Sequence, residues 1–290
     1  MDGDGDGDAG RAEHAFDRAV ALQPLPAGAA GAPRRFRGHT SADYANMVGP
    51  FGGITAAQAL QAVLLHPDRL GEPVAFTGNF AAALADGPFT VESVPARTNR
   101  STQHWTVTVH QPDASGRDAV VFTATAVTAV RRATWGATDR TMPAVPAADE
   151  VPSAPRIAHV AWFGRYDMRY FEGPMPREWD GAETPGSETG LWVRDEPPRP
   201  LDYASLTALC DSFYPRVWLR RATRTPIGTI SFSVYFHVDA ALLAACGTGH
   251  VLAQARGQRF FNGYFDQSGE LWSAAGQLLA TTHQLVYFKE

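Results

Sequence analysis

The sequence of 290 residues predicts an α+β protein with two tandem copies of one structural unit, each a long helix followed by antiparallel strands. Three observations predict this architecture. Apolar residues recur at helical spacing once in each half of the chain, and β-rich runs follow each of these segments. The same order of elements occurs in both halves, which indicates a duplication. A proline-rich stretch, Met142–Pro155, separates the halves and reads as a linker.

In the first copy, the helix is expected from Gly52 to His66, because its apolar residues fall on one helical face and Pro67 stops it. An extended segment, Pro73–Leu84, follows. Two longer β-rich runs come next, Phe89–Gln111 and Ala119–Arg131, and the second alternates Val, Thr and Ala.

The second copy repeats this order. A strand and a long polar loop precede its helix, and an extended segment and two β-rich runs come after it. The expected elements are a strand at Phe163–Phe171, a loop at Gly181–Pro200 with a short strand at Leu191–Val193, a helix at Asp202–Leu219, an extended segment at Gly228–Val238, and runs at Val251–Trp272 and Gln277–Phe288.

A helix wrapped by a curved antiparallel sheet is the hotdog arrangement, so the chain is predicted to be a double hotdog. Its two sheets would join edge to edge, which hides edges that otherwise invite aggregation. We expect a disordered acidic tail over 1–10, an N-terminal hotdog domain over 11–132, a linker over 133–157 and a C-terminal hotdog domain over 158–290.

The composition excludes several classes of function. A formal net charge of -5 argues against general binding to nucleic acid or to anionic membranes, since both favour a basic surface. No apolar run reaches the ~18 residues that a membrane span needs, and the acidic amino terminus is unlike a secretory signal. We therefore expect a cytoplasmic protein. Two cysteines, Cys210 and Cys246, make neither a disulfide framework nor a cysteine-rich metal site.

The amino terminus matches a calcium-loop pattern, with Asp2, Asp4, Asp6, Gly7 and a closing Glu13. Oxygen ligands at alternate positions suit calcium. However, the motif needs a preceding helix, and only Met1 precedes it. The histidines also show no close metal-ligand spacing. We expect no metal and no cofactor.

Asp211 is the most unusual polar residue, because it follows Leu206, Leu209 and Cys210 in the most apolar helix of the second copy. A carboxylate in that position is costly unless it is paired or hydrogen-bonded. Burial would raise its pKa, which suits a general base near neutral pH. The alternative is a charge on the solvent side of the helix, paired with Arg216 or acting like a cap near the break at Pro215.

Comparing the copies favours a functional site in the second one. When the helices are aligned, Ala59 stands where the second copy has Asp211. When the last strands are aligned, Ala126 stands where the second copy has Gln284. One site shared by two duplicated domains would leave this asymmetry, although drift at exposed positions would leave it too.

Three segments resemble the acyl-CoA thioesterase II (TesB-like) family: Asn46–Gly53, Arg97–Gln103 and Gly276–Gln284. The resemblance extends from about Phe16 to Phe288, and it rests on order and spacing rather than on one specific motif. Enzymes of this family are double hotdogs that hydrolyse fatty acyl-CoA thioesters. The resemblance therefore implies an acyl-CoA substrate, a role in lipid metabolism and a homo-oligomer.

The family's water-activating aspartate, threonine and glutamine fall on Asp211, Thr229 and Gln284. The resemblance implies that Asp211, held by the other two, deprotonates a water molecule that attacks the thioester carbonyl. Strict strand alternation would turn Thr229 away from the face of Ile230 and Phe232. Either a bulge at the start of the strand corrects this, or Thr229 is a surface residue.

Other residues are candidates for supporting roles. Gly52 and Gly53 could supply backbone N–H groups to an oxyanion, or could only permit close packing. A histidine that some family members have in the strand after the first helix is absent here. Arginines near the ends of elements could meet the phosphates of CoA, or could simply be solvated: Arg97, Arg100, Arg220, Arg221 and Arg224.

Competing nucleophiles receive less support. Cys210 points about 100° away from Asp211 on a helix and has no nearby histidine, so a buried structural cysteine is favoured. His283 faces the opposite side of its strand from Gln284. The leading hypothesis is an acyl-CoA thioesterase, and the alternative is an acyl-CoA-binding protein of the same fold without catalytic activity.

Overall fold

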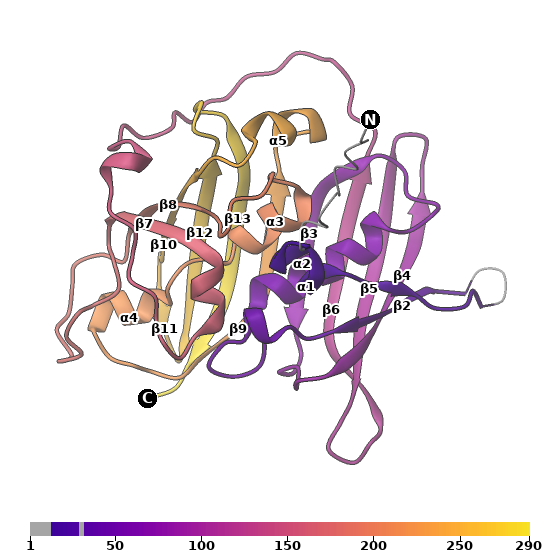
Figure 1. The fold of residues 1–290 in the computed structure, drawn as a ribbon, viewed down its shortest axis with the longest axis horizontal. Helices are drawn as coiled ribbons and strands as arrows, with labels where there is room; N and C mark the ends of the chain where they lie inside the picture. Colours follow the sequence, from indigo (N-terminus) through magenta and orange to yellow (C-terminus); the bar gives the residue numbers. More distant parts are fainter. Residues whose placement is uncertain (1–12, 29–31) are drawn as a thin grey trace, which may run out of the picture.

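The computed structural model describes residues 13–28 and 32–290. The expected acidic tail, 1–10, and the Asp2–Gly7 part of the calcium-loop match lie outside these residues. The two halves of the chain lie side by side, and one sheet runs through both (Figure 1). The order of the strands is β1-β2-β4-β5-β6-β3-β9-β13-β12-β10-β8-β7, with β11 paired to β12.

The first half contains one long helix and the strands that surround it. Its elements are α1 (Ala15–Val20), β1 (Gln23–Pro24), β2 (Arg34–His39), η1 (Ala42–Tyr44), α2 (Gly52–Leu64), β3 (Glu72–Phe80), β4 (Pro88–Thr98), β5 (Thr102–Pro112) and β6 (Asp118–Ala129).

The second half repeats this plan with a shorter central helix. Its elements are η2 (Ala148–Glu150), η3 (Ala161–Arg165), β7 (Tyr166–Glu172), β8 (Thr189–Asp195), α3 (Tyr203–Leu209), α4 (Arg216–Arg221), β9 (Ile227–Phe236), α5 (Ala240–Cys246), β10 (Val251–Arg256), β11 (Phe260–Phe261), β12 (Tyr264–Trp272) and β13 (Leu278–Phe288).

The two copies join through antiparallel pairing of β3 with β9, which confirms the expected edge-to-edge fusion. Thr77 lies opposite Ser233 at the centre of this seam, and their hydroxyl oxygens are 2.9 Å apart. Neither β3 nor β9 is left with a free edge, since β6 and β13 pair with their other sides. The protein is therefore a double hotdog.

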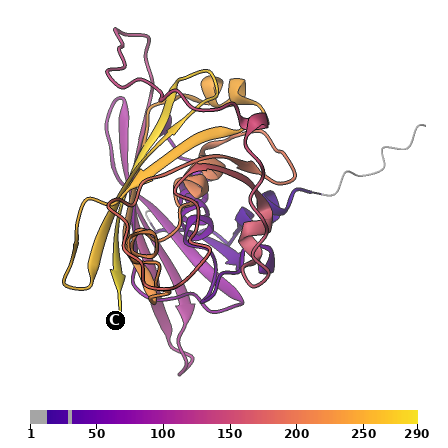
Figure 2. The same ribbon diagram turned by 90° about the vertical axis from the view of Figure 1, so that its left-hand side faces the viewer.

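The helices α2 and α3 pack against each other on the concave side of the sheet, which curves around them (Figure 2). Close approach requires Gly53, because a Cβ atom there would lie 2.6 Å from the carbonyl oxygen of Ala208 in α3. Leu60 of α2 and Leu206 of α3 are fully buried in one continuous apolar core that contains residues of both copies. The arrangement places the first turn of α2 beside the end of α3.

The internal symmetry extends to irregularities in the strands. The register between β3 and β6 shifts around Val74, and the register between β9 and β13 shifts around Ile230, so each copy has a β-bulge at the same place. Beyond the bulges, Phe76 lies opposite Ala126, and Phe232 lies opposite Gln284. The strand alignment made from the sequence is therefore confirmed.

The prediction of one helix over Asp202–Leu219 was wrong. Helix α3 ends at Leu209, and α4 begins only at Arg216. Pro215 accounts for the break, because proline has no N–H for the helix and its ring disfavours helical backbone in the preceding residue. Asp211 therefore lies in the turn between two helices and not within one.

Several strand boundaries also differ from the prediction. The run Phe89–Gln111 is two strands, β4 and β5, and Val251–Trp272 is three, β10, β11 and β12. Asn262 and Gly263 form the turn of the β11–β12 hairpin with positive φ angles, a recognisable Asn-Gly signal that the prediction overlooked. The prediction also missed α5, although Asp239 caps it by accepting a hydrogen bond from the N–H of Leu242.

No helix in the described part of the chain is long and apolar enough to cross a membrane.

Arg216 anchors the turn that carries Asp211. Its side chain is fully buried and donates hydrogen bonds to the carbonyl oxygens of Tyr214 and Ser187 and to the hydroxyl of Thr189. Burial lowers its pKa to about 9. It does not pair with Asp211, so that alternative from the sequence is excluded; its hydrogen bonds tie the turn to β8.

We expect Arg216→Met to lower the free energy of unfolding by roughly 3 kcal/mol or more, because it leaves two buried carbonyl groups without donors. Urea unfolding measures the change. Arg140→Met is the matched control, since Arg140 is exposed and its partner, Glu270, is at the surface too, and we expect no measurable loss there. An Arg216→Met protein as stable as the wild type would contradict the anchoring role.

Candidate active site

Asp211 lies in the turn after α3 and faces the start of α2 in the other copy. Its N–H donates to the carbonyl oxygen of Ala208 at 3.0 Å, which closes a tight turn directly after the helix. A Cβ atom on Gly52 would lie 2.7 Å from Oδ2 of Asp211 and 3.3 Å from the ring of Phe80. The carboxylate therefore occupies the seam between the two hotdog units.

Gln284 holds this carboxylate from the sheet. Its Nε2 donates to Oδ1 of Asp211 at 2.8 Å, across 73 residues of sequence. Gln284 is only 5% exposed and lies on the inner face of β13, opposite the buried Phe232 of β9. The structure thus brings together two of the three residues that the resemblance indicated.

Thr229 lies on the same face of the sheet, but it makes no hydrogen bond to Asp211 or Gln284 in the structure. The bulge at Ile230 pairs Thr229 with the buried Val286, two residues beyond Gln284 in β13. Residues directly opposite each other project to the same side, so Thr229 faces inward. From the sequence, Thr229 could face the site if a bulge interrupted the start of its strand, and this is that bulge.

The environment of Asp211 raises its pKa to about 7, chiefly because burial removes water from the carboxylate. The amide group of Gln284 and the backbone N–H of Gly53 oppose this rise. Part of the residue still contacts solvent. A carboxyl group with these properties changes its charge near neutral pH and remains within reach of water.

Glycine is required at both positions that open α2, because side chains there would collide with Asp211 at Gly52 and with Ala208 and Phe51 at Gly53. The first turn of a helix presents unpaired N–H groups and a partial positive charge. The glycines therefore permit the close packing that the sequence allowed for, and they place the first turn of α2 beside the Asp211 carboxylate, which the N–H of Gly53 bonds.

The structure divides the candidate arginines into two groups. Arg97 lies near the end of β4 and Arg100 lies in the β4–β5 turn, which meets the end of β6, where the N–H of Val130 donates to the carbonyl oxygen of Ser101. Phe80, beside the Asp211 site, pairs with Phe122 at the start of β6, seven residues before Ala129. At ~3.3 Å per residue this separation is roughly 23 Å. These two arginines are therefore distant from Asp211.

The other three arginines lie at the same end of the sheet as Thr229. Arg220 and Arg221 end α4, and Arg224 precedes β9 by three residues. Arg221 pairs with Glu290, and the guanidinium of Arg224 stacks on Trp179 at 4.6 Å. These three arginines are therefore at the same end of the sheet as the Asp211 site, unlike the other two.

The competing nucleophiles are unsuited to catalysis. Burial raises the pKa of the Cys210 thiol well above its usual value, so the thiolate is disfavoured. His283 is exposed on the outer face and lies 3.4 Å from Asp266. No group of three or more His, Cys, Asp or Glu residues that could hold a metal occurs within 13–28 and 32–290.

The internal symmetry relates the Asp211 site to an equivalent position at the opposite end of the β3–β9 seam. That position lacks the polar side chains of the site. Pro73 corresponds to Thr229, Ala126 to Gln284, and Phe236 to Phe80. The ring of Tyr203 packs on Phe236 there, with centroids 5.4 Å apart. The described part of the chain therefore has one such arrangement.

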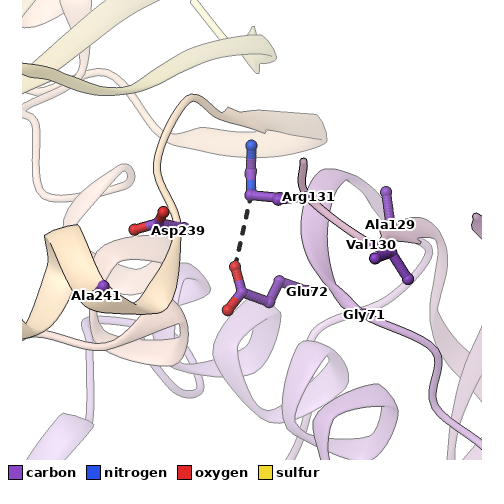
Figure 3. Close-up of a pocket in the computed structure, with 7 residues that line it drawn as sticks. All are labelled: Gly71, Glu72, Ala129, Val130, Arg131, Asp239 and Ala241. Carbon is purple, nitrogen blue, oxygen red and sulfur yellow. Dashed lines mark ion pairs between the residues drawn. The ribbon is translucent and has the colours of Figure 1, made fainter. Parts of the chain in front are cut away.

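Two surface cavities of about 370 and 590 Å³ lie near this second position and not beside Asp211. Figure 3 shows the first cavity, where Glu72 and Arg131 form an ion pair at 3.6 Å across its floor. The hydroxyl of Tyr203 also donates to Glu72. The polar groups of this cavity therefore satisfy one another, whereas the Asp211 carboxylate faces the glycines that open α2.

Asp195 and Tyr166 were not among the functional residues predicted from the sequence. Asp195 is buried, and burial raises its pKa to about 7. It stands in Arg194-Asp195-Glu196-Pro197, which reads as an exposed turn. The residues that bury Asp195 come from α3 and from the amino-terminal segment. Because they are distant in sequence, the local pattern does not indicate that Asp195 is buried.

The raised pKa of Asp211 makes a testable statement about stability. Between about pH 4 and about pH 7 the folded protein holds this proton while the unfolded chain does not, so rising pH destabilises the fold. Asp211→Asn cannot ionise. Its stability relative to the wild type should therefore increase by roughly 1–3 kcal/mol between about pH 5 and about pH 8, allowing for partial solvent contact. Urea unfolding at both pH values measures this, and a difference independent of pH would contradict it.

Comparisons with known proteins agree with this architecture. Residues 41–129 match the family model of the acyl-CoA thioesterase N-terminal domain, and residues 139–288 match that of the acyl-CoA thioesterase C-terminal domain. A conserved protein of unknown function with a hot dog fold from Alicyclobacillus acidocaldarius is 48% identical, with a TM-score of 0.86 over 96% of this chain and 99% of that one.

More distant structures support the fold. The tesB protein of Mycobacterium avium subsp. paratuberculosis has a TM-score of 0.74 at 18% identity, over 95% of this chain and 98% of that one. An acyl-CoA thioesterase II from Mycobacterium marinum has a TM-score of 0.70 at 18% identity, over 94% and 98%. No curated protein matches the sequence significantly. The two matching domain models cover both halves of the chain, which therefore belongs to the acyl-CoA thioesterase family.

Proposed function

We propose that this protein hydrolyses acyl-CoA thioesters to a free acid and CoA, with Asp211 as the general base. The observation that carries the proposal is the desolvated Asp211 carboxylate, held by Gln284 at 2.8 Å beside the glycines that open α2. A base whose pKa lies near the working pH is suited to deprotonating water.

The proposed reaction is a single displacement. Asp211 takes a proton from a water molecule as the oxygen of that water bonds to the thioester carbonyl carbon. Thr229, on the same face of the sheet, orients this water through its hydroxyl. The backbone N–H of Gly53 bonds the Asp211 carboxylate, so the oxyanion role falls to the N–H of Gly52 and the positive end of the α2 dipole, which stabilise the negative charge on the carbonyl oxygen as the carbon–sulfur bond breaks.

We assign the phosphate groups of the substrate to the basic end of α4. Arg220, Arg221 and Arg224 lie at the same end of the sheet as Thr229 and contribute three positive charges, in a protein whose net charge is -5. Phosphate groups pair well with guanidinium groups. We expect the CoA phosphates to bind there and the acyl chain to extend toward the apolar core.

We further propose that the protein acts in cytoplasmic lipid metabolism as a homo-oligomer. Tyr235 and Leu285 support self-association, because these large apolar side chains are 53% and 42% exposed on the outer face of β9 and β13. Light scattering after size-exclusion chromatography tests the assembly, and a monomer at high concentration would contradict it.

Thiol release from acyl-CoAs of graded chain length tests the proposed reaction. We expect Asp211→Asn to lower kcat by about 10²–10⁴-fold with little change in KM, because it removes the base but keeps the shape of the residue. Thr229→Val and Gln284→Ala should lower kcat less. The wild-type kcat/KM should rise with pH and level off above about 7, as Asp211 ionises.

Asp118→Asn is the matched control, since the Asp118 side chain is exposed on β6, and its activity should equal that of the wild type. An Asp211→Asn protein with full activity would refute the site assignment. Acyl-CoA binding without thiol release at any chain length would refute the enzyme and leave the acyl-CoA-binding alternative.

A further inference from the structure

A second buried carboxyl group, Asp195, lies behind the candidate active site. It ends β8, and in the register of the sheet it pairs with Tyr166, the first residue of β7. Cross-strand partners project to the same side, so the two side chains are neighbours on the inner face. Tyr44 of η1 packs on Tyr166 with ring centroids 6.2 Å apart. Nothing in the proposed displacement uses these three side chains.

This cluster contains polar atoms that have no hydrogen-bond partner among the described residues. They are the hydroxyls of Tyr44 and Tyr166, Oδ1 of Asp195 and Nη1 of Arg199. Tyr44 is fully buried, Tyr166 is 5% exposed and Asp195 is 3% exposed. Buried polar groups are almost always satisfied by protein or by ordered water. The cluster thus offers three donors, two hydroxyls and one guanidinium N–H, and one acceptor, the carboxylate oxygen. Buried water molecules bind to groups of this kind.

The cluster adjoins Asp211. The ring of Tyr166 packs on Phe51 with centroids 6.2 Å apart, and the next residue, Gly52, contacts Asp211. Helix α3 gives a second connection, because Ser205 donates to Oδ2 of Asp195 at 2.8 Å and Asp211 follows six residues later. Asp211 also acts directly on Tyr166, because burial and then the surrounding charges, that of Asp211 among them, raise the pKa of the Tyr166 hydroxyl.

We propose that Tyr44, Tyr166 and Asp195 hold buried water behind the active site, and that this path carries away the proton that hydrolysis releases. The inference rests on the proposed thioesterase reaction. Attack breaks an O–H bond of water and the carbon–sulfur bond of the substrate. Asp211 passes the proton it took from water to the departing sulfur, and it takes up the proton of the acid product as that product ionises, so each turnover leaves one proton on Asp211.

In this path, the proton passes from Asp211 through bound water and the Tyr166 hydroxyl, which donates one proton as it accepts another, to the Asp195 carboxylate. Burial raises the pKa of both carboxyl groups to about 7, so transfer between them is nearly balanced. Asp195 lies 4.0 Å from Arg199, which binds the partly exposed Asp17 and Asp202 at 2.7 Å each. The proton leaves to solvent at this edge.

The charged and titratable groups that face the cluster come from every element packed around it. They are Asp17 on α1, Asp43 and Tyr44 on η1, Arg165 on η3, Tyr166 on β7, Arg199 and Asp202 before α3, and Asp211 after it. Asp195 is the member with a pKa near neutrality that lies between Asp211 and the surface.

Rapid-mixing measurement of thiol release from a good acyl-CoA substrate tests the path. Asp195→Asn and Tyr166→Phe keep the shape of each residue but block proton transfer. We expect a first turnover at the wild-type rate, followed by a steady state slower by at least about tenfold, which appears as a burst of one thiol per site. A residue that only supports the fold would slow the first and later turnovers equally.

Tyr170→Phe is the matched control, because Tyr170 is another β7 tyrosine whose hydroxyl donates to Met168 outside the cluster. It should show no burst and a wild-type rate. Unchanged steady-state rates in Asp195→Asn and Tyr166→Phe, or equal slowing of all turnovers, would overturn the path. A wild type that releases no thiol would instead refute the proposed function. A crystal structure with no water between Tyr166 and Asp195 would also overturn the path.

Discussion

The pairing of β3 with β9 is the constraint on which the rest of the structure depends. It joins two incomplete sheets into one and stacks α2 against α3 across the seam. The first turn of α2 then meets the end of α3, so that Gly52 of one copy contacts Asp211 of the other. The candidate site therefore does not exist within either copy alone.

One structural difference between the two copies distinguishes the Asp211 site from the symmetry-related position near Tyr203. In the first copy, α2 continues through Ala59, whereas α3 ends at Leu209, and Asp211 turns toward α2. The buried Arg216 holds the broken segment in place. At the counterpart position, Tyr203 and the ion pair between Glu72 and Arg131 occupy the space. The asymmetry between the copies thus has a structural basis in a shortened helix and not in drift at exposed positions.

Sequence patterns predicted the repeat, the strand alignment and the pair of Asp211 and Gln284, because these depend on local periodicity and on comparing one copy with the other. The helix break at Pro215 was visible in the sequence but received too little weight against a long apolar stretch. The inward orientation of Thr229 depends on a bulge, which requires the register of two strands. The burial of Asp195 is decided by residues distant in sequence, so a local pattern of charged residues before a proline was misleading.

The position of a bound substrate tests the central claim most directly. A crystal structure with a non-hydrolysable acyl-CoA analogue, in which a methylene group replaces the sulfur, would locate the carbonyl group. The account predicts that its carbon lies beside Asp211 at the first turn of α2, with a water molecule bound between the carbonyl carbon and the carboxylate. An analogue bound in the cavity of Glu72 and Arg131, with its carbonyl group remote from Asp211, would contradict the account.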